Sequence, residues 1–212
     1  MQKVALLILI FSLSFSVSAQ RKFQKELDSV TTVEKAQHFI NSINGRKNKI
    51  TPFNQEKHKT RLSEELLKLP NAGHTVLRKK GENIHYKVLE KNELIYYRVS
   101  YIMLDGKEFS ISNIEKLRPQ IKAKHRPGIL FKDLATQYYM DKNKTNDGDS
   151  GWFTFGDMLP EFEQHVMNDS HQVNDIFTVN VESNQWSYVV KKTHDKKSIT
   201  EIKVLKVAES TR

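Results

Sequence analysis

The chain has 212 residues and no cysteine, which excludes disulfides and thiolate metal sites and makes an oxidising compartment harmless to the fold. Its 34 Lys and Arg residues against 25 Asp and Glu residues give a formal net charge of +9. Because most of the lysines are interspersed with acidic residues, the charge alone predicts a solvated surface and no particular ligand.

The N-terminal residues 1–19 have the pattern of a secretory signal peptide. A short basic start is followed by the apolar run Val4–Val17, which only serines interrupt, and by a small-residue cleavage site ending at Ala19. A spanning helix needs about 20 mostly apolar residues, so this run predicts no stable membrane span. The alternative is a buried N-terminal helix, which the polar sequence that follows disfavours. We expect a mature chain that starts at Gln20, is periplasmic or secreted, and meets acidic membrane surfaces or acidic unfolded polypeptides and no nucleic acid.

Residues 23 to about 70 show the three- and four-residue apolar spacing of helices. Asn44-Gly45 ends the first apolar stripe, Thr51-Pro52 opens a second helical segment, and Pro70 ends it. The stripes are compatible with a cradle that binds other polypeptides and with ordinary core packing. Their apolar residues are Val30, Val33, Ala36, Phe39, Ile40 and Ile43 in the first segment and Leu62, Leu66, Leu67 and Leu69 in the second.

From His74 the apolar pattern changes to that of strands. Thr75–Lys79 and Ile84–Leu89, separated by a short polar turn, predict a β-hairpin. Lys91-Asn92 predicts a second turn. The sequence therefore predicts an N-terminal helical module with a hairpin over residues 20–92.

The second half of the chain alternates strands and helices. Leu94–Leu104 predicts one long strand that places Tyr101 and Met103 on the same face. Ser110–Lys124 is typical of a helix, although Pro119 should kink or split it. The remaining predicted elements are a helix over Phe131–Tyr139, a polar loop over Asp141–Gly151, a short helix over Leu159–Val166, strands over Asp175–Val181 and Gln185–Lys192, and a C-terminal strand or tail over 194–212.

Two motifs in this half carry a family resemblance. The run Asp147–Phe153 (DGDSGWF) is followed by the run Met158–Glu163 (MLPEFE). In order and spacing they resemble the Gly-Gly-Asp-Leu-Gly-Trp-Phe and Met-Val-Pro-Glu-Phe-Glu runs of the parvulin family of peptidyl-prolyl isomerases. The resemblance covers about residues 93–193. It implies an α+β, parvulin-like domain with a four-stranded antiparallel sheet and flanking helices, preceded by the small helical module and β-hairpin.

The resemblance also implies which residues act on a prolyl bond. It assigns Met158 and Phe162 to the wall that holds the proline ring, and Asp141 to the position that faces the substrate amide. Rotation about a prolyl bond faces a barrier of about 18–20 kcal/mol, which amide resonance causes. The twisted transition state loses the charge separation of the amide, so an apolar pocket favours it over the ground state. Without the family, Met158 and Phe162 are typical core residues, and Asp141 is typical of a helix end or turn.

The chain departs from the family pattern at several positions. Parvulins usually have two histidines that hydrogen-bond across the sheet beneath the pocket, and this chain has Tyr101 and Tyr188 in their places. A phenol donates and accepts a hydrogen bond but does not protonate near neutral pH. We expect the two hydroxyls to meet across one rung of an antiparallel ladder, bonded to each other or to Asp141, and to support the pocket floor. Ser150 replaces the usual leucine before Gly-Trp-Phe, and the glycine of the last turn is replaced around Gln185.

Other chemistries lack support in the sequence. A calcium loop starting at Asp141 needs glycine at its sixth position and glutamate at its twelfth, where this chain has Asn146 and Trp152. The eight histidines show no metal-ligand spacing, and no nucleophile-elbow sequence occurs. We therefore predict no metal and no cofactor.

The predicted function is a peptidyl-prolyl cis–trans isomerase and folding helper for exported proteins. Its predicted partners are unfolded or proline-containing polypeptides. The alternative is a non-catalytic periplasmic chaperone or binding module with a degenerate pocket. A weaker third hypothesis is a structural envelope protein that docks through its N-terminal module.

Overall fold

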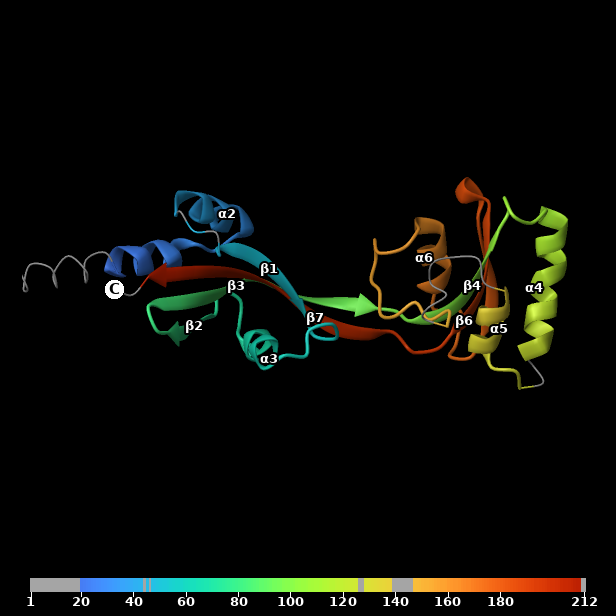
Figure 1. Ribbon diagram of the computed structural model, residues 1–212. Coiled ribbons are helices and arrows are strands. Elements are labelled where there is room, and N and C mark those ends of the chain that lie inside the picture. The colour runs from blue at the N-terminus through green and yellow to red at the C-terminus, as the bar shows by residue number, and fades with distance from the viewer. Residues whose placement is uncertain (1–19, 44, 46, 126–127, 139–146, 211–212) are drawn as a thin grey trace, which may run out of the picture. The chain divides into compact units, whose positions relative to one another are not determined.

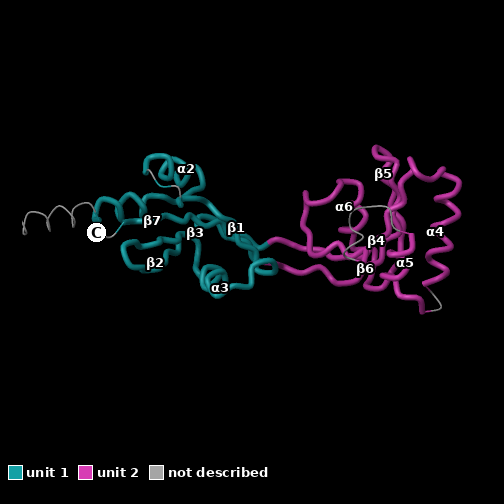
Figure 2. The backbone as a smooth tube through the Cα atoms, viewed as in Figure 1, with its two compact units in different colours: residues 1–93, 200–212 teal, residues 94–199 magenta. Residues whose placement is uncertain are grey.

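The computed structural model describes residues 20–43, 45, 47–125, 128–138 and 147–210 (Figure 1). The expected signal peptide therefore lies outside the described residues. The chain falls into two compact units, of which unit 1 comprises residues 1–93 and 200–212 and unit 2 comprises residues 94–199 (Figure 2). Unit 2 is continuous in sequence, whereas unit 1 draws on both ends of the chain.

Unit 1 is built on a four-stranded sheet. In chain order its elements are a helix over residues 20–29, α2 (Val33–Ser42), β1 (Lys49–Asn54), α3 (Arg61–Lys68), β2 (His74–Lys79), β3 (Glu82–Tyr96) and β7 (Lys197–Ser210). The strand order is β1-β7-β3-β2, with β1 antiparallel to β7 and β2 antiparallel to β3. The predicted hairpin is confirmed as the β2–β3 pair.

Two predictions within unit 1 are wrong. The helix expected to open at Thr51-Pro52 is strand β1, and helix α3 begins only after Thr60, which forms a capping box with Ser63. Pro52 is tolerated because β1 lies at the edge of the sheet. The turn expected at Lys91-Asn92 is also absent, because β3 runs through both residues. Lys91 instead uses its ammonium group to bind two backbone carbonyls at the end of α3, at 2.7 and 3.0 Å.

Both faces of the unit 1 sheet are buried, and β7 shows this residue by residue. Leu205 packs in one cluster with Leu27 of the helix over residues 20–29 and Phe39 of α2, whereas Val204 packs in another with Leu66 of α3. The first helical segment was compatible with a polypeptide-binding cradle or with core packing, and its residue Phe39 packs in the core. None of the helices in the described ranges is long and apolar enough to cross a membrane.

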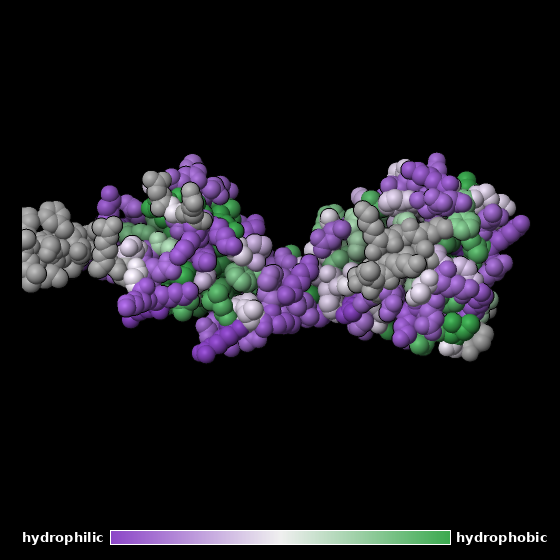
Figure 3. Space-filling model, in the orientation of Figure 1, coloured by the Kyte–Doolittle hydropathy of each residue, from purple (hydrophilic) through white to green (hydrophobic). Residues whose placement is uncertain are grey.

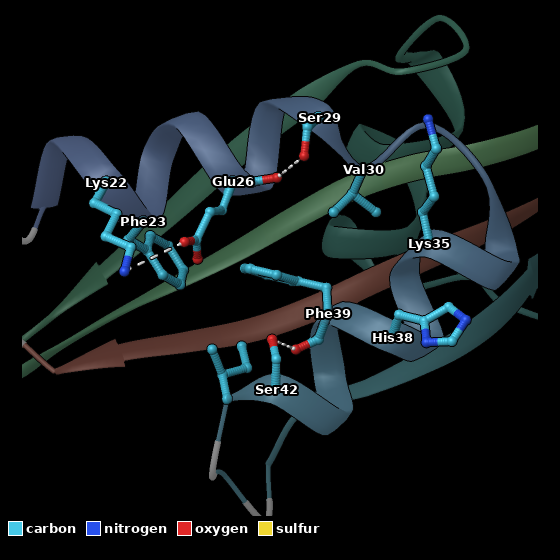
Figure 4. A pocket seen from close by; sticks show the side chains of 10 residues that line it. Lys22, Phe23, Glu26, Ser29, Val30, Lys35, His38, Phe39 and Ser42 are labelled. Atoms are coloured by element: carbon cyan, nitrogen blue, oxygen red, sulfur yellow. Dashed lines mark hydrogen bonds and ion pairs between the residues drawn. The ribbon is translucent and has the colours of Figure 1, made fainter.

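The surface of unit 1 also has a groove of about 880 Å³ between the helix over residues 20–29 and α2 (Figure 4). Phe23 and Phe39 lie in it, with ring centroids 5.8 Å apart. Lys22 and Glu26 stand on one side of the groove and Lys35 on the other (Figure 4). Elsewhere, hydrophilic side chains cover most of the visible face of both units (Figure 3).

Unit 2 is a three-stranded antiparallel sheet with helices on both faces. Its elements are β4 (Val99–Asp105), α4 (Ile111–His125), α5 (Phe131–Tyr138), α6 (Pro160–Val166), β5 (Ile176–Val181), the 3-10 turn η2 (Glu182–Asn184) and β6 (Trp186–Lys192). The strand order is β4-β6-β5. Helices α4 and α5 cover one face, against Ile102 and Val189, and α6 covers the other, against Met103 and Val190. Of the kink or split expected at Pro119, the split does not occur, because α4 runs through this residue as one helix.

The expected strand Leu94–Leu104 is interrupted, because β3 ends at Tyr96 and β4 begins at Val99. The fourth position in the sheet of unit 2 is taken by residues 149–153, which form two single bridges, Ser100↔Asp149 and Tyr97↔Phe153. The mixed architecture of antiparallel sheet and flanking helices confirms the predicted α+β class.

Candidate functional site

Helix α6 places an aromatic ring against the sheet of unit 2. Pro160 stands in its first turn, where a missing backbone N–H breaks no helical bond. Two residues later, Phe162 turns inward and is only 3% exposed. Its ring centroid lies 5.0 Å from that of Tyr188, 5.6 Å from that of Tyr101 and 6.4 Å from that of Phe153. All three contacts are edge-on or tilted, the arrangement that aromatic pairs prefer.

The two tyrosines lie on the same face of the sheet but not opposite each other. In the β4–β6 ladder, Tyr101 pairs with Val190 and Tyr188 pairs with Met103. The prediction that the phenols meet across one rung is therefore wrong, because the two residues are diagonal neighbours. Their ring centroids are nevertheless 5.7 Å apart, since diagonal neighbours stay within reach of long aromatic side chains.

A segment beginning at Gly148 runs along the outer edge of β4. The N–H of Tyr101 donates to the carbonyl of Gly148 (2.8 Å), and the N–H of Ser150 donates to the carbonyl of Val99 (2.9 Å). Gly148 has φ +78°, and a Cβ at this position would lie 2.7 Å from the carbonyl oxygen of Tyr101, so only glycine fits. The Ser150 hydroxyl accepts from the N–H of Val99 (3.0 Å), a bond that the leucine usual in the family cannot make.

An ion pair ties this segment to the start of β4. Arg98 Nε donates to Asp149 Oδ1 (3.0 Å), and Arg98 Nη2 donates to the second carboxylate oxygen. The N–H of Gly151 also donates to Asp149 Oδ1 (3.0 Å). Burial by itself raises the pKa of Asp149, but the hydrogen bonds from Arg98 and Gly151 outweigh it and hold that pKa below its ordinary value. The carboxylate is therefore charged at neutral pH and suited to fixing the segment.

A buried carboxylate fixes the loop that leads into α6. Glu163 is 3% exposed, and its oxygens accept from the N–H of Gly156 (2.8 and 3.1 Å) and from the N–H of Met158 (2.9 Å). These bonds make the burial of a charge tolerable. They also hold Met158 beside the aromatic cluster, where its side chain is partly buried.

Four of the five residues predicted for the site lie together. Met158, Phe162, Tyr101 and Tyr188 belong to one apolar cluster on the α6 face of the sheet. The fifth residue, Asp141, lies outside the described residues. The sequence analysis did not predict that Glu163 fixes the loop before α6. The position of Glu163 at the end of the Met158–Glu163 motif is the signal that could have indicated this role.

A second cluster of titratable side chains lies in unit 1. His85 is 4% exposed and stands between His74 (Nδ1 to Nε2, 3.1 Å) and Glu209 (Nε2 to Oε2, 3.1 Å). Burial lowers the pKa of His74, and the neighbouring His85 lowers it further. The three residues come from the neighbouring strands β2, β3 and β7, so the cluster ties the sheet together. Within the described part of the chain, no group of three or more His, Asp or Glu residues is arranged to hold a metal ion.

Comparison with known proteins identifies the region that contains the aromatic cluster. A sequence model of the PPIC-type PPIase (peptidyl-prolyl isomerase) domain matches residues 85–197, more than half of the chain. The foldase protein PrsA of Halalkalibacterium halodurans is 32% identical over 79 residues, which are 37% of this chain and 21% of that protein. The foldase protein PrsA of Geobacillus kaustophilus is 35% identical over 97 residues, which are 42% of this chain and 32% of that protein. The chain thus spans no more than a third of the length of these curated relatives.

Two solved structures are also similar to the chain. PrsA from Bacillus subtilis is 24% identical, with a TM-score of 0.38, and the match covers 47% of this chain and 35% of that one. The peptidylprolyl isomerase PrsA from Bacillus anthracis is 28% identical, with a TM-score of 0.39, and the match covers 49% of this chain and 44% of that one. The matched residues 85–197 include the motif runs and the four described site residues. The chain therefore belongs to the PPIC-type PPIase domain family.

Proposed function

We propose that unit 2 is a peptidyl-prolyl cis–trans isomerase that acts on proline-containing segments of unfolded polypeptides, and that the chain helps exported proteins to fold. The observation that supports this most directly is the apolar aromatic cluster on the α6 face, inside the region that matches the isomerase family. Such a surface suits the reaction, because the twisted amide of the transition state has less charge separation than the planar ground state.

The proposal gives each candidate residue a part. Met158 and Phe162 form the wall of the site that holds the proline ring. Met158 and Tyr101 are partly exposed and offer the accessible surface, whereas Phe162 is buried and supports both. Tyr188 closes the floor of the site through its ring contact with Phe162. Asp141 is assigned the position facing the substrate amide by the family resemblance alone.

A non-catalytic chaperone or binding module is the second candidate. It is favoured by Tyr101 and Tyr188, which occupy the positions where parvulins usually have their two histidines. In this case the cluster binds a proline-containing segment without accelerating its isomerisation.

An exchange measurement on a short proline peptide, by NMR or by a protease-coupled assay, separates the two candidates. We expect the chain to raise the isomerisation rate above background, and Met158→Ala to lower kcat/KM by about tenfold, because it removes apolar surface at the proline ring. Met167→Ala is the matched control, since Met167 is also a partly buried methionine beside the cluster but lies at the other end of α6. A rate at background, with aggregation of an unfolded reference protein still suppressed, would leave the chaperone as the function.

Export is a separate part of the proposal. Processing after Ala19 predicts a mature protein that begins at Gln20 in the periplasm or the medium. N-terminal sequencing of the protein from its native cells tests this, and recovery of a chain with intact Met1 in the membrane fraction contradicts it.

A further inference from the structure

Phe155 is the most exposed large apolar side chain in the described residues, at 83%. A ring left in water gains almost no hydrophobic free energy from folding, because that gain scales with the apolar area removed from solvent. Phe155 therefore does not stabilise the fold through burial, and its position next to the candidate site calls for another explanation.

The ring stands at the tip of a tight turn. The N–H of Asp157 donates to the carbonyl of Thr154 (3.1 Å), which makes Phe155 the second residue of a four-residue turn. Gly156, the third residue, has φ +90°, a conformation that favours glycine. The N–H of Thr154 donates to the Asp157 carboxylate (3.0 Å) and closes the turn a second time.

The turn is also fixed from both sides. Behind it, the buried Glu163 accepts from the N–H of Gly156, inside the turn, and from the N–H of Met158, just after it. In front of it, the Thr154 hydroxyl donates to the carbonyl of Ile95 (2.9 Å). Because the backbone is already ordered, a ligand that packs on Phe155 loses little conformational entropy of the protein.

The turn joins two parts of the aromatic cluster. Phe153, two residues before Phe155, is 3% exposed and contacts Phe162. Met158, three residues after Phe155, packs against the same cluster. Two residues of chain span at most about 7 Å, and an extended polypeptide advances about 3.3 Å per residue. A polypeptide whose proline lies on the cluster is therefore long enough to reach Phe155 with a side chain about two residues away.

We infer that Phe155 is a specificity-determining residue that binds an apolar side chain of the client about two residues from the proline. The inference rests on the proposed binding of proline-containing segments by the cluster. The protein then prefers clients that have an apolar residue at this flanking position, because that residue packs on the aromatic ring of the hydrogen-bonded turn. Phe155 takes no part in bond rotation itself, so its effect falls on KM or Kd and not on kcat.

Two peptides test this, identical except for leucine or glutamine at the flanking position. We expect the parent to prefer the leucine peptide by about fivefold in kcat/KM, the strength of one exposed aromatic contact. In Phe155→Ser the preference for the leucine peptide should disappear, whereas kcat/KM for the glutamine peptide should not change. Ile111→Ser is the control, because Ile111 is 74% exposed on α4, which covers the other face of the sheet.

The turn itself supplies a second variant. Glu163→Gln removes the charge that fixes Gly156 and Met158, so the preference should fall without loss of the Phe155 ring. Glu161→Gln, a change of the same kind one position before Phe162 on α6, should keep the preference.

Binding of the same peptides, measured by fluorescence anisotropy, separates this inference from the proposed function. If the parent does not isomerise either peptide but binds leucine over glutamine through Phe155, the enzyme proposal fails and the inference holds. If Phe155→Ser keeps the full leucine preference, the inference is overturned. Loss of a concentration-dependent dimer in Phe155→Ser, with the preference unchanged, overturns it too and assigns the ring to a contact between copies of the chain.

Discussion

The two faces of the unit 2 sheet have different compositions. The face under α4 and α5 is packed mainly with aliphatic side chains, among them Ile102, Ile121 and Leu134. The face under α6 is richer in aromatic residues. Beside five valines and Met103 its buried part contains Phe153, Phe162, Phe177 and Tyr188, and Tyr97, Tyr101 and Trp186 pack against it. Aliphatic residues fill a closed interior efficiently, whereas flat rings can present an edge or a face to a ligand.

The hydrogen bonds differ between the faces as well. The α6 side is bounded by the Arg98–Asp149 pair and by Glu163, which fix a loop segment and a turn. On the other side, Arg118 of α4 donates to Asn180 of β5 (2.8 Å) and so links helix to sheet. Both faces of the sheet thus contribute to the core, but the α6 face also keeps irregular backbone in place beside its aromatic residues.

Large expected effects of truncating one buried side chain on each face separate the two faces directly. Leu134→Ala, on the aliphatic face, should lower the free energy of unfolding by about 2–5 kcal/mol, since it opens a cavity under α5. Urea denaturation measures this loss. The kcat/KM of the remaining folded protein should stay within about twofold of the parent, because the change is remote from the site.

Phe162→Ala should cost about 3–5 kcal/mol of stability, because the ring is buried, and should also abolish isomerisation. Phe162→Leu is the sharper variant, since it keeps an apolar side chain while removing three ring contacts. We expect it to fold and to lose about tenfold in kcat/KM. Full activity in Phe162→Leu would place the residue in the core alone and remove the functional distinction between the faces.

The double change Tyr101→Phe with Tyr188→Phe removes the two hydroxyls and keeps both rings. If the hydroxyls support the site through hydrogen bonds, kcat/KM should fall by about three- to tenfold, because a factor of this size corresponds to the net free energy of one hydrogen bond. The peptide exchange assay gives the rate, and circular dichroism verifies the fold. An unchanged rate would mean that the rings alone matter.

The activity should also depend little on pH between about 5.5 and 7.5, because tyrosines stand where the family usually has histidines, whose ordinary pKa is about 6.5. A pH–rate profile over this range tests the expectation. A step near pH 6.5 would contradict it.

A smaller effect is expected at the edge of β4. The pKa of Asp149 is held below its ordinary value, so this residue contributes stability at pH values above that ordinary value and loses the contribution as the pH falls through its folded-state pKa. Asp149→Asn should therefore be less stable than the parent by about 1 kcal/mol near neutral pH, a modest figure because the pair is partly exposed. Urea midpoints of the two proteins should converge once the pH falls below the folded-state pKa of Asp149. A constant difference across the range would show that the ion pair is not its cause.

The smallest effect is expected at Gln185, which has φ +58° at the end of η2. A non-glycine residue in this left-handed conformation carries about 1–2 kcal/mol of strain. Glycine removes the strain, but it loses more conformational entropy on folding, which offsets part of the gain. Gln185→Gly should therefore stabilise the protein by about 0.5 kcal/mol, measured as a rise in the urea midpoint. Gly106→Ala is the opposite control, since a Cβ at Gly106 would lie 2.6 Å from the carbonyl oxygen of Gln185. A loss of stability in Gln185→Gly would mean that the glutamine side chain has its own stabilising contact.

The sequence predicted the parts of the molecule that depend on local patterns. The β2–β3 hairpin and the cluster of Met158, Phe162, Tyr101 and Tyr188 both follow from residues within short runs or from the family motif. It failed where a partner lies far along the chain. Strand β1 carries a proline and looks like a helix start, and it is a strand only because β7 pairs with it from the opposite end of the sequence.

The ladder between the tyrosines shows a finer limit. Alternation along each strand correctly places Tyr101 and Tyr188 on one face, but it does not set the register of β4 against β6. No short turn joins these two strands, because α4, α5, α6 and β5 lie between them in the chain, so no turn type fixes their register. The bonds of Glu163 to Gly156 and Met158 could not be predicted either, because they join a helix to backbone N–H groups whose direction only the fold determines.

The position of β7 has a consequence for the order in which the chain folds. In the sheet of unit 1, β7 lies between β1 and β3, so β1 has no strand to pair with until β7 has been synthesised. Residues 94–199 are complete before that moment and can fold first. Their folding shortens the loop between β3 and β7, whose closure entropy grows with the logarithm of its length. The last strand then joins a nearly finished sheet, where Thr200 Oγ1 donates to Glu93 Oε1 at 2.6 Å. The pairing of β1, the first strand of this sheet in chain order, thus depends on β7, the last of its strands to be synthesised.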